Sequence, residues 1–156
     1  MKDKKELVLA APSEEDALAI EQYKKEFEEA HQLLQGMEQE RGLDEALSTI
    51  PNRTFLYKDE TGRIVGMSNL RLGLNAFLYE HAGHVGYSIR PSEQGKGYGT
   101  ELLRATLWMA FMAGFDQVLV VCHRDNQASR RMIENCGGVP EEENGEWCRY
   151  WVATQE

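Results

Sequence analysis

Three glycines lie close together in the middle of the chain, within Gln94-Gly95-Lys96-Gly97-Tyr98-Gly99-Thr100. A strand-like segment precedes them and a helical pattern follows, so this loop leads into the start of a helix. Glycine lets the backbone turn sharply and leaves consecutive N–H groups uncovered by a Cβ, while the helix dipole adds positive potential. The spacing matches neither the G-x-x-x-x-G-K-[ST] loop nor the G-x-G-x-x-G fingerprint. The segment therefore predicts a phosphate or pyrophosphate site, against the alternative of a tight turn without a ligand.

A second polar pattern begins at Asn126 and continues through Ser129 and Ile133 to Gly137-Gly138. Asn126 alone could simply be a helix N-cap. Taken together, the two segments resemble the GCN5-related N-acetyltransferase (GNAT) family. Residues 94–99 resemble its Q/R-x-x-G-x-G/A motif, and residues 126–138 resemble its N-x-x-[AS]-x-x-x-[YI]-x-x-x-G-[FG] helix. The order of expected strands and helices also agrees with the family from residue 7 to residue 152.

The resemblance implies that acetyl-CoA binds as the acyl donor. No metal is expected, because the spacing of the four histidines and three cysteines matches no usual ligand pattern. The glycine loop would hold the pyrophosphate, and the backbone of residues 88–90 would pair with pantetheine in a slot between two diverging parallel strands. Asn126 would lie near the thioester and Ser129 would face the pantetheine arm. Tyr98 is expected to pack against the helix or the adenine side. The expected acyl-CoA-binding residues are Ile89, Gln94, Gly95, Lys96, Gly97, Tyr98, Gly99, Thr100, Asn126 and Ser129.

The catalytic residues are harder to assign. The attacking amine must lose a proton, since a lysine-like amine has a pKa of about 10.4, and the departing thiolate must gain one. In many relatives a Tyr of the Asn-containing helix protonates the sulfur, but the matching position here is Ile133, which has no proton to give. The catalytic candidates that remain are His84, Tyr150 and Asn126.

Each candidate has a structural alternative. His84 starts the strand before the glycine loop, where many relatives place a Glu base, and its unperturbed pKa of about 6.5 suits that role; it could instead fix the loop over residues 73–83. Tyr150 lies on the last expected strand, which in this family passes close to the sulfur. The structural alternative is that Tyr150 is a core aromatic residue. Cys122 ends a buried strand beside the slot and is interpreted as a core residue.

The surrounding pattern predicts the elements that position these residues. Strands are expected over residues 6–11, 54–58, 63–72, 84–90, 117–122 and 146–153. Helices are expected from Ser13 towards Leu34, with Gly36 as a break, and over residues 43–50, 97–113 and 126–135. Residues 73–83 are predicted to be a loop, and Asn144-Gly145 a hairpin turn.

Composition excludes several other classes of protein. The 156 residues suit one domain, and a hydrophobic fraction of 42% supports an ordinary core. The net charge of −9 argues against nucleic acid or an anionic membrane as a partner. Residues 1–50 carry six basic and thirteen acidic side chains, which suggests either a solvated helix face or attraction for a cationic acceptor. Three widely spaced cysteines and the lack of a signal-like or membrane-spanning run favour a cytoplasmic location.

The expected fold is therefore α+β: a GNAT-like domain over residues 1–156, with a mixed, mostly antiparallel twisted sheet of six to seven strands that splits in a V. Residues 1–50 form a strand and an acidic helical arm, and residues 84–136 form the acyl-CoA-binding core. The expected function is acetyl transfer from acetyl-CoA to a primary amine of a small molecule or peptide. The alternative is a catalytically silent module that binds or senses acyl-CoA. A homodimer is possible.

Overall fold

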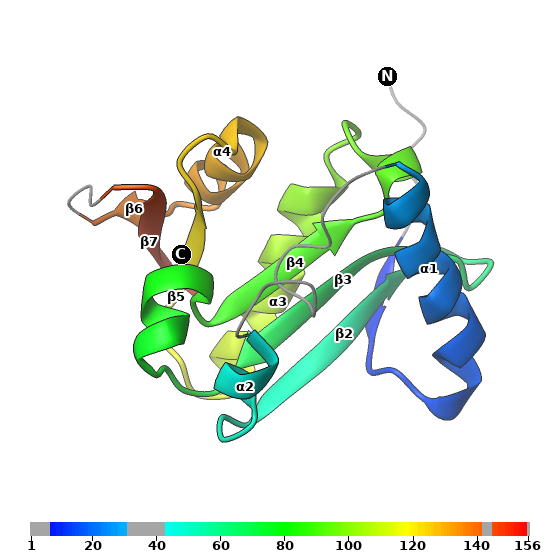
Figure 1. Ribbon diagram of the computed structural model, residues 1–156, viewed down its shortest axis with the longest axis horizontal. Coiled ribbons are helices and arrows are strands. Elements are labelled where there is room, and N and C mark those ends of the chain that lie inside the picture. The colour runs from blue at the N-terminus through cyan, green and yellow to red at the C-terminus, as the bar shows by residue number, and fades with distance from the viewer. Residues whose placement is uncertain (1–6, 31–42, 142–144, 156) are drawn as a thin grey trace.

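The structure is a computed structural model that describes residues 7–30, 43–141 and 145–155 (Figure 1). Its elements follow in this order: β1 (Val8–Ala10), η1 (Glu14–Asp16), α1 (Ala17–Glu29), α2 (Leu43–Leu47), β2 (Asn52–Lys58), β3 (Ile64–Arg71), η2 (Leu78–Ala82), β4 (Val85–Ile89), η3 (Pro91–Glu93), α3 (Tyr98–Met112), β5 (Gln117–His123), α4 (Gln127–Asn135), β6 (Val139–Pro140) and β7 (Trp147–Ala153). This alternation of helices and strands confirms the α+β class.

The strands form two antiparallel sheets. One has the order β1-β2-β3-β4 and the other the order β5-β7-β6. In the first sheet β2 and β3 pair as the expected hairpin, with Phe55 opposite Ser68. All eight residues of β3 are buried, because helices cover both of its faces. The sequence predicted one sheet of six to seven strands, and the structure divides seven strands between two sheets.

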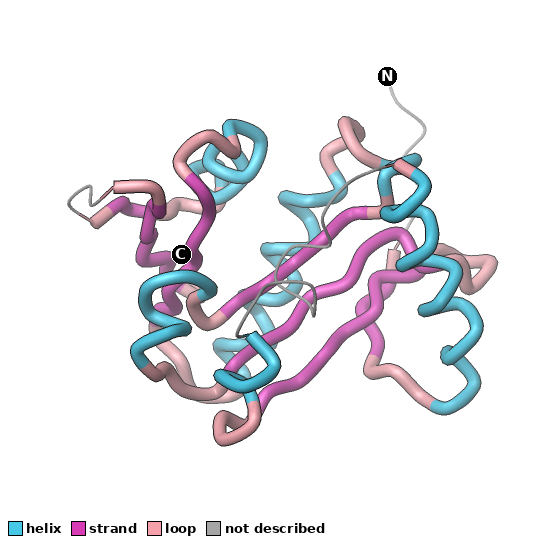
Figure 2. Tube along the Cα trace, in the orientation of Figure 1, coloured by secondary structure: helices cyan, strands magenta, loops and turns pink. Residues whose placement is uncertain are grey.

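The two sheets meet at the start of β4. A bridge joins Gly83 to Val120, and the His84 N–H donates to the Leu119 carbonyl at 2.7 Å. Gly83 has a φ of +69°, and a Cβ there would lie 2.5 Å from the Leu119 oxygen. Beyond this junction β4 and β5 run in the same general direction and diverge (Figures 1 and 2). The expected V-shaped split is therefore present, with glycine at its apex.

Helices enclose the first sheet. α1 and α2 lie on one face and α3 on the other (Figure 1). Tyr23 and Phe27 of α1 pack on Leu56, Ile64 and Met67. The largest apolar cluster joins α3 and α4 to strands of both sheets and includes Leu103, Leu107, Ile133 and Val152. β4 therefore lies between two helical layers, and the exposed glycine loop follows it.

Local signals explain the boundaries of α1 and α3. The Asp16 carboxylate accepts the Ser13 backbone N–H at 2.8 Å, which is one arm of the predicted capping box. Gly97 is the N-cap of α3 in a left-handed conformation. The continuation of the first helix to Leu34, the break at Gly36 and the turn residue Asn144 lie outside the described residues. None of the helices within the described ranges has the length and apolar character that a bilayer crossing requires.

Candidate functional site

A cavity of about 660 Å³ lies against β4, on residues of this strand and of the segments that follow it. Its walls come from β4, from the loop into α3 and from α4. It brings together nine of the ten residues that the sequence predicted for acyl-CoA binding. These nine are Ile89, Gln94, Gly95, Gly97, Tyr98, Gly99, Thr100, Asn126 and Ser129.

The glycine loop supplies the anion-binding end of this cavity. Gly97 has a φ of +87°, a conformation that few other residues adopt, and it turns the chain directly into α3. The first-turn N–H groups of a helix have no carbonyl partner inside the helix, and the dipole favours negative charge there. Gly99 has another reason to be small, because a Cβ at this position would collide with the Met132 sulfur of α4. The loop therefore fits a pyrophosphate, with Gly99 allowing α3 and α4 to approach closely.

The edge of β4 that faces the split carries backbone groups suited to an extended ligand. Arg90 donates its N–H to Val65 of β3 at 2.8 Å, so the alternate residues 88 and 86 also face β3. The backbone groups of Tyr87 and Ile89 then point the other way, towards β5. The Gln94 side chain already donates to the Ile89 carbonyl at 2.9 Å. These directions fit the expected pairing of Ile89 with pantetheine.

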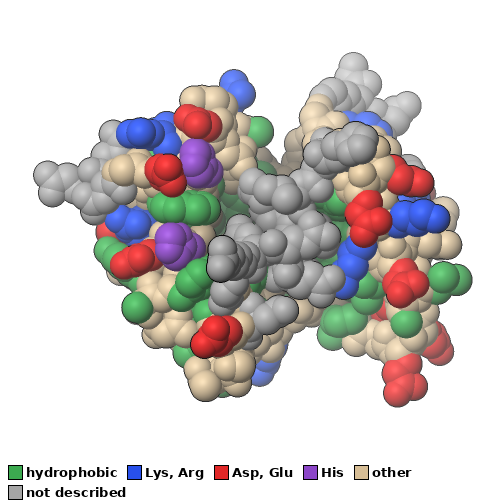
Figure 3. All heavy atoms as spheres, viewed as in Figure 1, with side chains coloured by type: hydrophobic (Ala, Val, Ile, Leu, Met, Phe, Trp, Pro, Cys, Tyr) green, Lys and Arg blue, Asp and Glu red, His purple; other side chains and the backbone are tan. Residues whose placement is uncertain are grey.

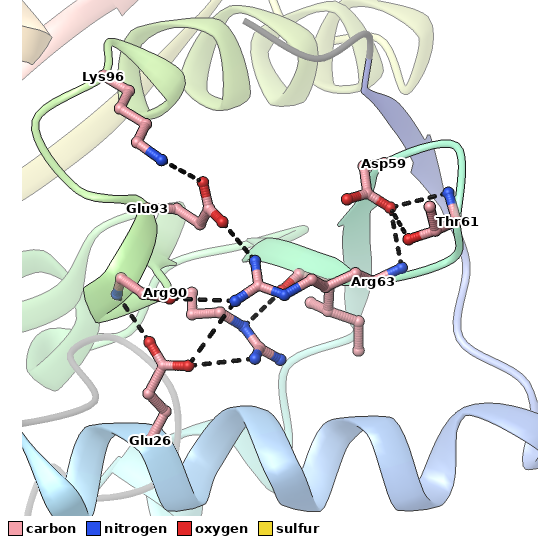
Figure 4. A network of polar contacts seen from close by, with 9 residues as sticks. Glu26, Asp59, Thr61, Arg63, Arg90, Glu93 and Lys96 are labelled. Atoms are coloured by element: carbon pink, nitrogen blue, oxygen red, sulfur yellow. Dashed lines mark hydrogen bonds and ion pairs between the residues drawn. The ribbon is translucent and has the colours of Figure 1, made fainter.

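Lys96 is the predicted residue that the described cavity wall does not include. Its Nζ lies 3.0 Å from Glu93, whose buried carboxylate also pairs with Arg63 (Figure 4). Burial alone would raise the pKa of Glu93, but Lys96 and Arg63 outweigh it and hold the pKa low. The cavity wall does include Glu93. The two cations neutralise a carboxylate that would otherwise repel phosphate.

The same network ties α1 to the loop. The Glu26 carboxylate accepts the Ser92 N–H at 2.7 Å and contacts Arg90 at 3.2 Å (Figure 4). Burial would raise the pKa of Glu26, but the Ser92 bonds and the charges of Arg90 and Arg63 lower it. The loop is thus anchored from the face of the sheet that α1 covers.

The beginning of α4 forms a third, polar wall. Asn126 caps this helix, and its Oδ1 accepts the Ser129 N–H at 3.1 Å. The Ser129 hydroxyl is hydrogen-bonded to the Tyr87 hydroxyl, and both side chains line the cavity. Asn126 is thus a cap and a cavity residue at once, so the two interpretations of it are compatible.

Two adjacent arginines of α4 lie in different surroundings. Arg131 is exposed in the cavity wall and has no hydrogen-bond or ion-pair partner among the described residues. The Nε of Arg130 donates to the Tyr150 hydroxyl at 3.2 Å, and a terminal nitrogen of Arg130 donates to the Arg124 carbonyl at 3.3 Å. Arg131 can therefore serve a phosphate group, whereas Arg130 joins α4 to its neighbours.

His84 is buried at the junction of the sheets and is not part of the described cavity wall. Its Nδ1 accepts the Leu119 N–H at 2.9 Å, and its ring contacts Phe115 and Trp151. Burial, followed by the charge of Arg71, lowers the pKa of His84 to about 4. The expectation of a mildly perturbed base is thus contradicted. His84 fastens β4 to β5, close to the structural alternative that the sequence left open.

The structure also places Tyr150 and Ile133 away from the described cavity wall. The Tyr150 hydroxyl donates to Glu134 at 2.9 Å and accepts from Arg130. Burial raises the pKa of this phenol. Ile133 is fully buried in the main core, as is Tyr150. Cys122 belongs to the same core, as expected, and burial raises the pKa of its thiol to about 11.

Besides the nine predicted residues and Ser88, the cavity wall includes seven residues that sequence reasoning did not single out: Phe27, Tyr87, Glu93, Ala128, Arg131, Met132 and Asn135. Tyr87 and Glu93 lie in the strand and loop that carry the first motif, and Arg131 lies inside the second. The positions of these three residues in or beside the motifs could have indicated them, but the direction of each side chain depends on packing. No group of three or more His, Cys, Asp or Glu side chains in the described ranges is arranged to bind a metal.

A split sheet whose opening combines a glycine-rich helix start with a capped second helix is the arrangement expected of a domain of the acetyltransferase type. The chain belongs to this family, since residues 6–139 match the acetyltransferase (GNAT) domain model. No curated protein matches the sequence at a significant level.

Solved structures share the fold at low sequence identity. A ribosomal-protein-S5-alanine acetyltransferase from Vibrio fischeri has a TM-score of 0.72 and 18% identity, with 99% of this chain and 97% of that chain covered. A spermidine N-acetyltransferase from Vibrio cholerae in complex with CoA and spermine has a TM-score of 0.66 and 18% identity, with 95% of both chains covered. At these identities the likeness shows the fold.

Proposed function

We propose that this protein is an N-acetyltransferase that transfers the acetyl group of acetyl-CoA to a primary amine of a small molecule or peptide by direct attack. The observation that carries the proposal is the cavity in the split sheet. Its three walls offer helix-start amides for a pyrophosphate, an outward strand edge for pantetheine and the polar cap of a second helix. Residues 84–136 then form the acyl-CoA core of a domain spanning residues 1–156.

A cationic amine is the acceptor class that the charge distribution favours. Acidic side chains are frequent along α1, among them Glu21, Glu28 and Glu29, and Figure 3 shows acidic groups on the side of the molecule that α1 covers. The related spermidine N-acetyltransferase was crystallised with spermine. Polyamines are therefore the first acceptors to test, followed by aminoglycosides and lysine-like amines.

Two measurements test the proposal. Calorimetry with CoA measures binding, and release of free thiol from acetyl-CoA measures turnover in the presence of spermidine, spermine, an aminoglycoside, lysine and a peptide with a free N-terminus. We expect CoA to bind and at least one amine to raise thiol release above the amine-free rate. CoA binding without turnover on any amine would support the silent binding module instead. No CoA binding would overturn both.

A further inference from the structure

Two tyrosine–serine hydroxyl pairs flank β4, one on each face. The Tyr87 hydroxyl bonds to Ser129 of α4, and the Tyr23 hydroxyl of α1 lies 2.8 Å from the Ser88 hydroxyl. Successive strand residues point to opposite faces, so the pairs lie on opposite sides of the sheet. Tyr87, Ser129 and Ser88 line the cavity, whereas Tyr23 does not. The two pairs are alike in chemistry, but only the tyrosine of the first pair lines the cavity.

Along β4, Tyr87 lies nearer the junction of the two sheets than Ile89 does. β4 runs from the junction with β5 to the glycine loop, and Tyr87 precedes Ile89 by two residues, or roughly 7 Å. If the loop holds the pyrophosphate, the thioester lies in this direction, near Asn126. Ile133, the position at which the resemblance implied a tyrosine, is buried in the core one helical turn after Ser129. β4 therefore supplies the hydroxyl that α4 lacks.

We propose that the Tyr87 hydroxyl donates a hydrogen bond to the thioester sulfur and to the thiolate that leaves, and that Ser129 orients it. This inference rests on the proposed function. In the reaction a bond forms between the amine nitrogen and the carbonyl carbon, and the C–S bond breaks with its electron pair on sulfur. The nitrogen loses one proton to solvent and the sulfur gains one from solvent. Tyr87 keeps its own proton throughout.

The surroundings of Tyr87 suit a donor that stays neutral. Burial raises its pKa far above the usual range, and the nearby Cys122, Cys136 and Tyr150 raise it further, while the bond to Ser129 opposes them. The phenol is therefore protonated at every pH at which the protein is assayed. The Ser129 hydroxyl can donate and accept, so it can hold the Tyr87 oxygen while the phenolic proton points to sulfur.

The pKa of the thiol of bound CoA tests this bond without any turnover. Thiolate absorbance is followed during a pH titration of the CoA complex, with the desulfo-CoA complex as the blank. We expect Tyr87→Phe to raise the pKa of the bound thiol by about one, a tenfold loss of thiolate at a given pH. Ser129→Ala should raise it by less. Tyr23→Phe, which removes the matched hydroxyl on the opposite face, should leave it unchanged.

Several outcomes would overturn the proposal. If Tyr87→Phe binds CoA and leaves the pKa of the bound thiol unshifted, the proposal is wrong and the hydroxyl pair only joins β4 to α4. If Tyr87→Phe fails to fold, an unshifted thiol pKa in Ser129→Ala counts against the proposal in the same way. With an active acceptor, Tyr87→Phe should lower kcat about tenfold, leave KM for acetyl-CoA unchanged and keep the shape of the pH profile. If the unsubstituted protein does not bind CoA, that result would instead contradict the proposed function.

Discussion

Arg130 and Arg131 differ in function although they are adjacent and carry the same charge. Arg131 lines the cavity, so we expect Arg131→Gln to weaken CoA binding about tenfold, the lower end for a hydrogen bond to a charged group. The loss should shrink as salt rises, because an exposed cation is screened. Calorimetry at two salt concentrations measures both effects.

The neighbouring position supplies the control. Arg130→Gln removes the same charge from the same helix, but its contacts are with Tyr150 and Arg124. It should lower thermal stability and leave CoA affinity within about twofold. Equal losses of affinity in the two variants would mean that the net charge, and not the cavity position, accounts for binding.

His84 should govern stability, not the pH dependence of turnover. Its folded pKa of about 4 lies below the unfolded value of about 6.5, so the unfolded chain takes up the proton first as pH falls. The contribution of His84 to the free energy of unfolding is fully present above pH 6.5 and is lost as the pH falls towards 4. Urea unfolding should therefore show a decrease of about 2 kcal/mol between pH 7 and pH 5 that is absent in His84→Gln. An equal decrease in both proteins would assign the effect to other groups.

Local motifs predicted most of the cavity wall but not the hydroxyl pair beside it. The glycine loop and the capped helix are continuous in sequence, so Gly97, Asn126 and Ser129 could be placed from spacing. The surroundings of His84 could not be predicted, because they depend on Leu119, which lies 35 positions away in sequence. Tyr87 was missed for a similar reason, since its partner Ser129 is 42 positions away.

At the level of elements, the long strands and helices were predictable and the short ones were not. Alternation and helical periodicity gave β2, β3, β5, α3 and α4 within a few residues. The expected loop over residues 73–83 contains η2, whose start is fixed by the Asn75 side chain accepting the Leu78 N–H at 2.9 Å. β6 has two residues and exists through its pairing with β7. The start of η2 thus rests on a local cap within a segment expected to be a loop, whereas β6 depends on a tertiary contact that no local pattern encodes.

Gly83 should be the most sensitive glycine of the junction. Its φ of +69° with a ψ of −167° belongs to a region that is essentially reserved for glycine, and a Cβ would meet the Leu119 oxygen. We expect Gly83→Ala to lower the free energy of unfolding by about 3 kcal/mol or more. Backbone strain alone reaches about this value at its upper limit, and the collision with the Leu119 oxygen adds to it. Unfolding in urea measures this cost.

Gly62 is the matched control for Gly83. It has a φ of +86°, but a Cβ there would meet nothing within 4 Å. Gly62→Ala should therefore cost only the strain of a left-handed residue, about 1–2 kcal/mol. If the two variants are equally stable, the close approach of β4 to β5 at Gly83 does not constrain the fold.

At the scale of the whole molecule, the two faces of the first sheet have different partners. α3 and α4 face the proposed acyl donor, and α1 carries acidic groups and anchors the glycine loop through Glu26. Residues 31–42 of the acidic helical arm lie outside the described residues, and the role of the arm in binding an acceptor stays a prediction. The possible homodimer also stays a prediction, which sedimentation analysis can check.

The divided sheet has a consequence for the lifetime of the protein. A ligand bonded to the outward groups of Tyr87 and Ile89 would join the two sheets, so CoA should slow amide exchange at these two positions. Exchange at Ser88, whose backbone faces β3, should not change. Uniform slowing along β4 would contradict pairing at its edge.

CoA at 100 times its Kd adds about 2.7 kcal/mol to the free energy of unfolding. Proteases act on opened chains, so the supply of CoA should set how long the protein survives digestion.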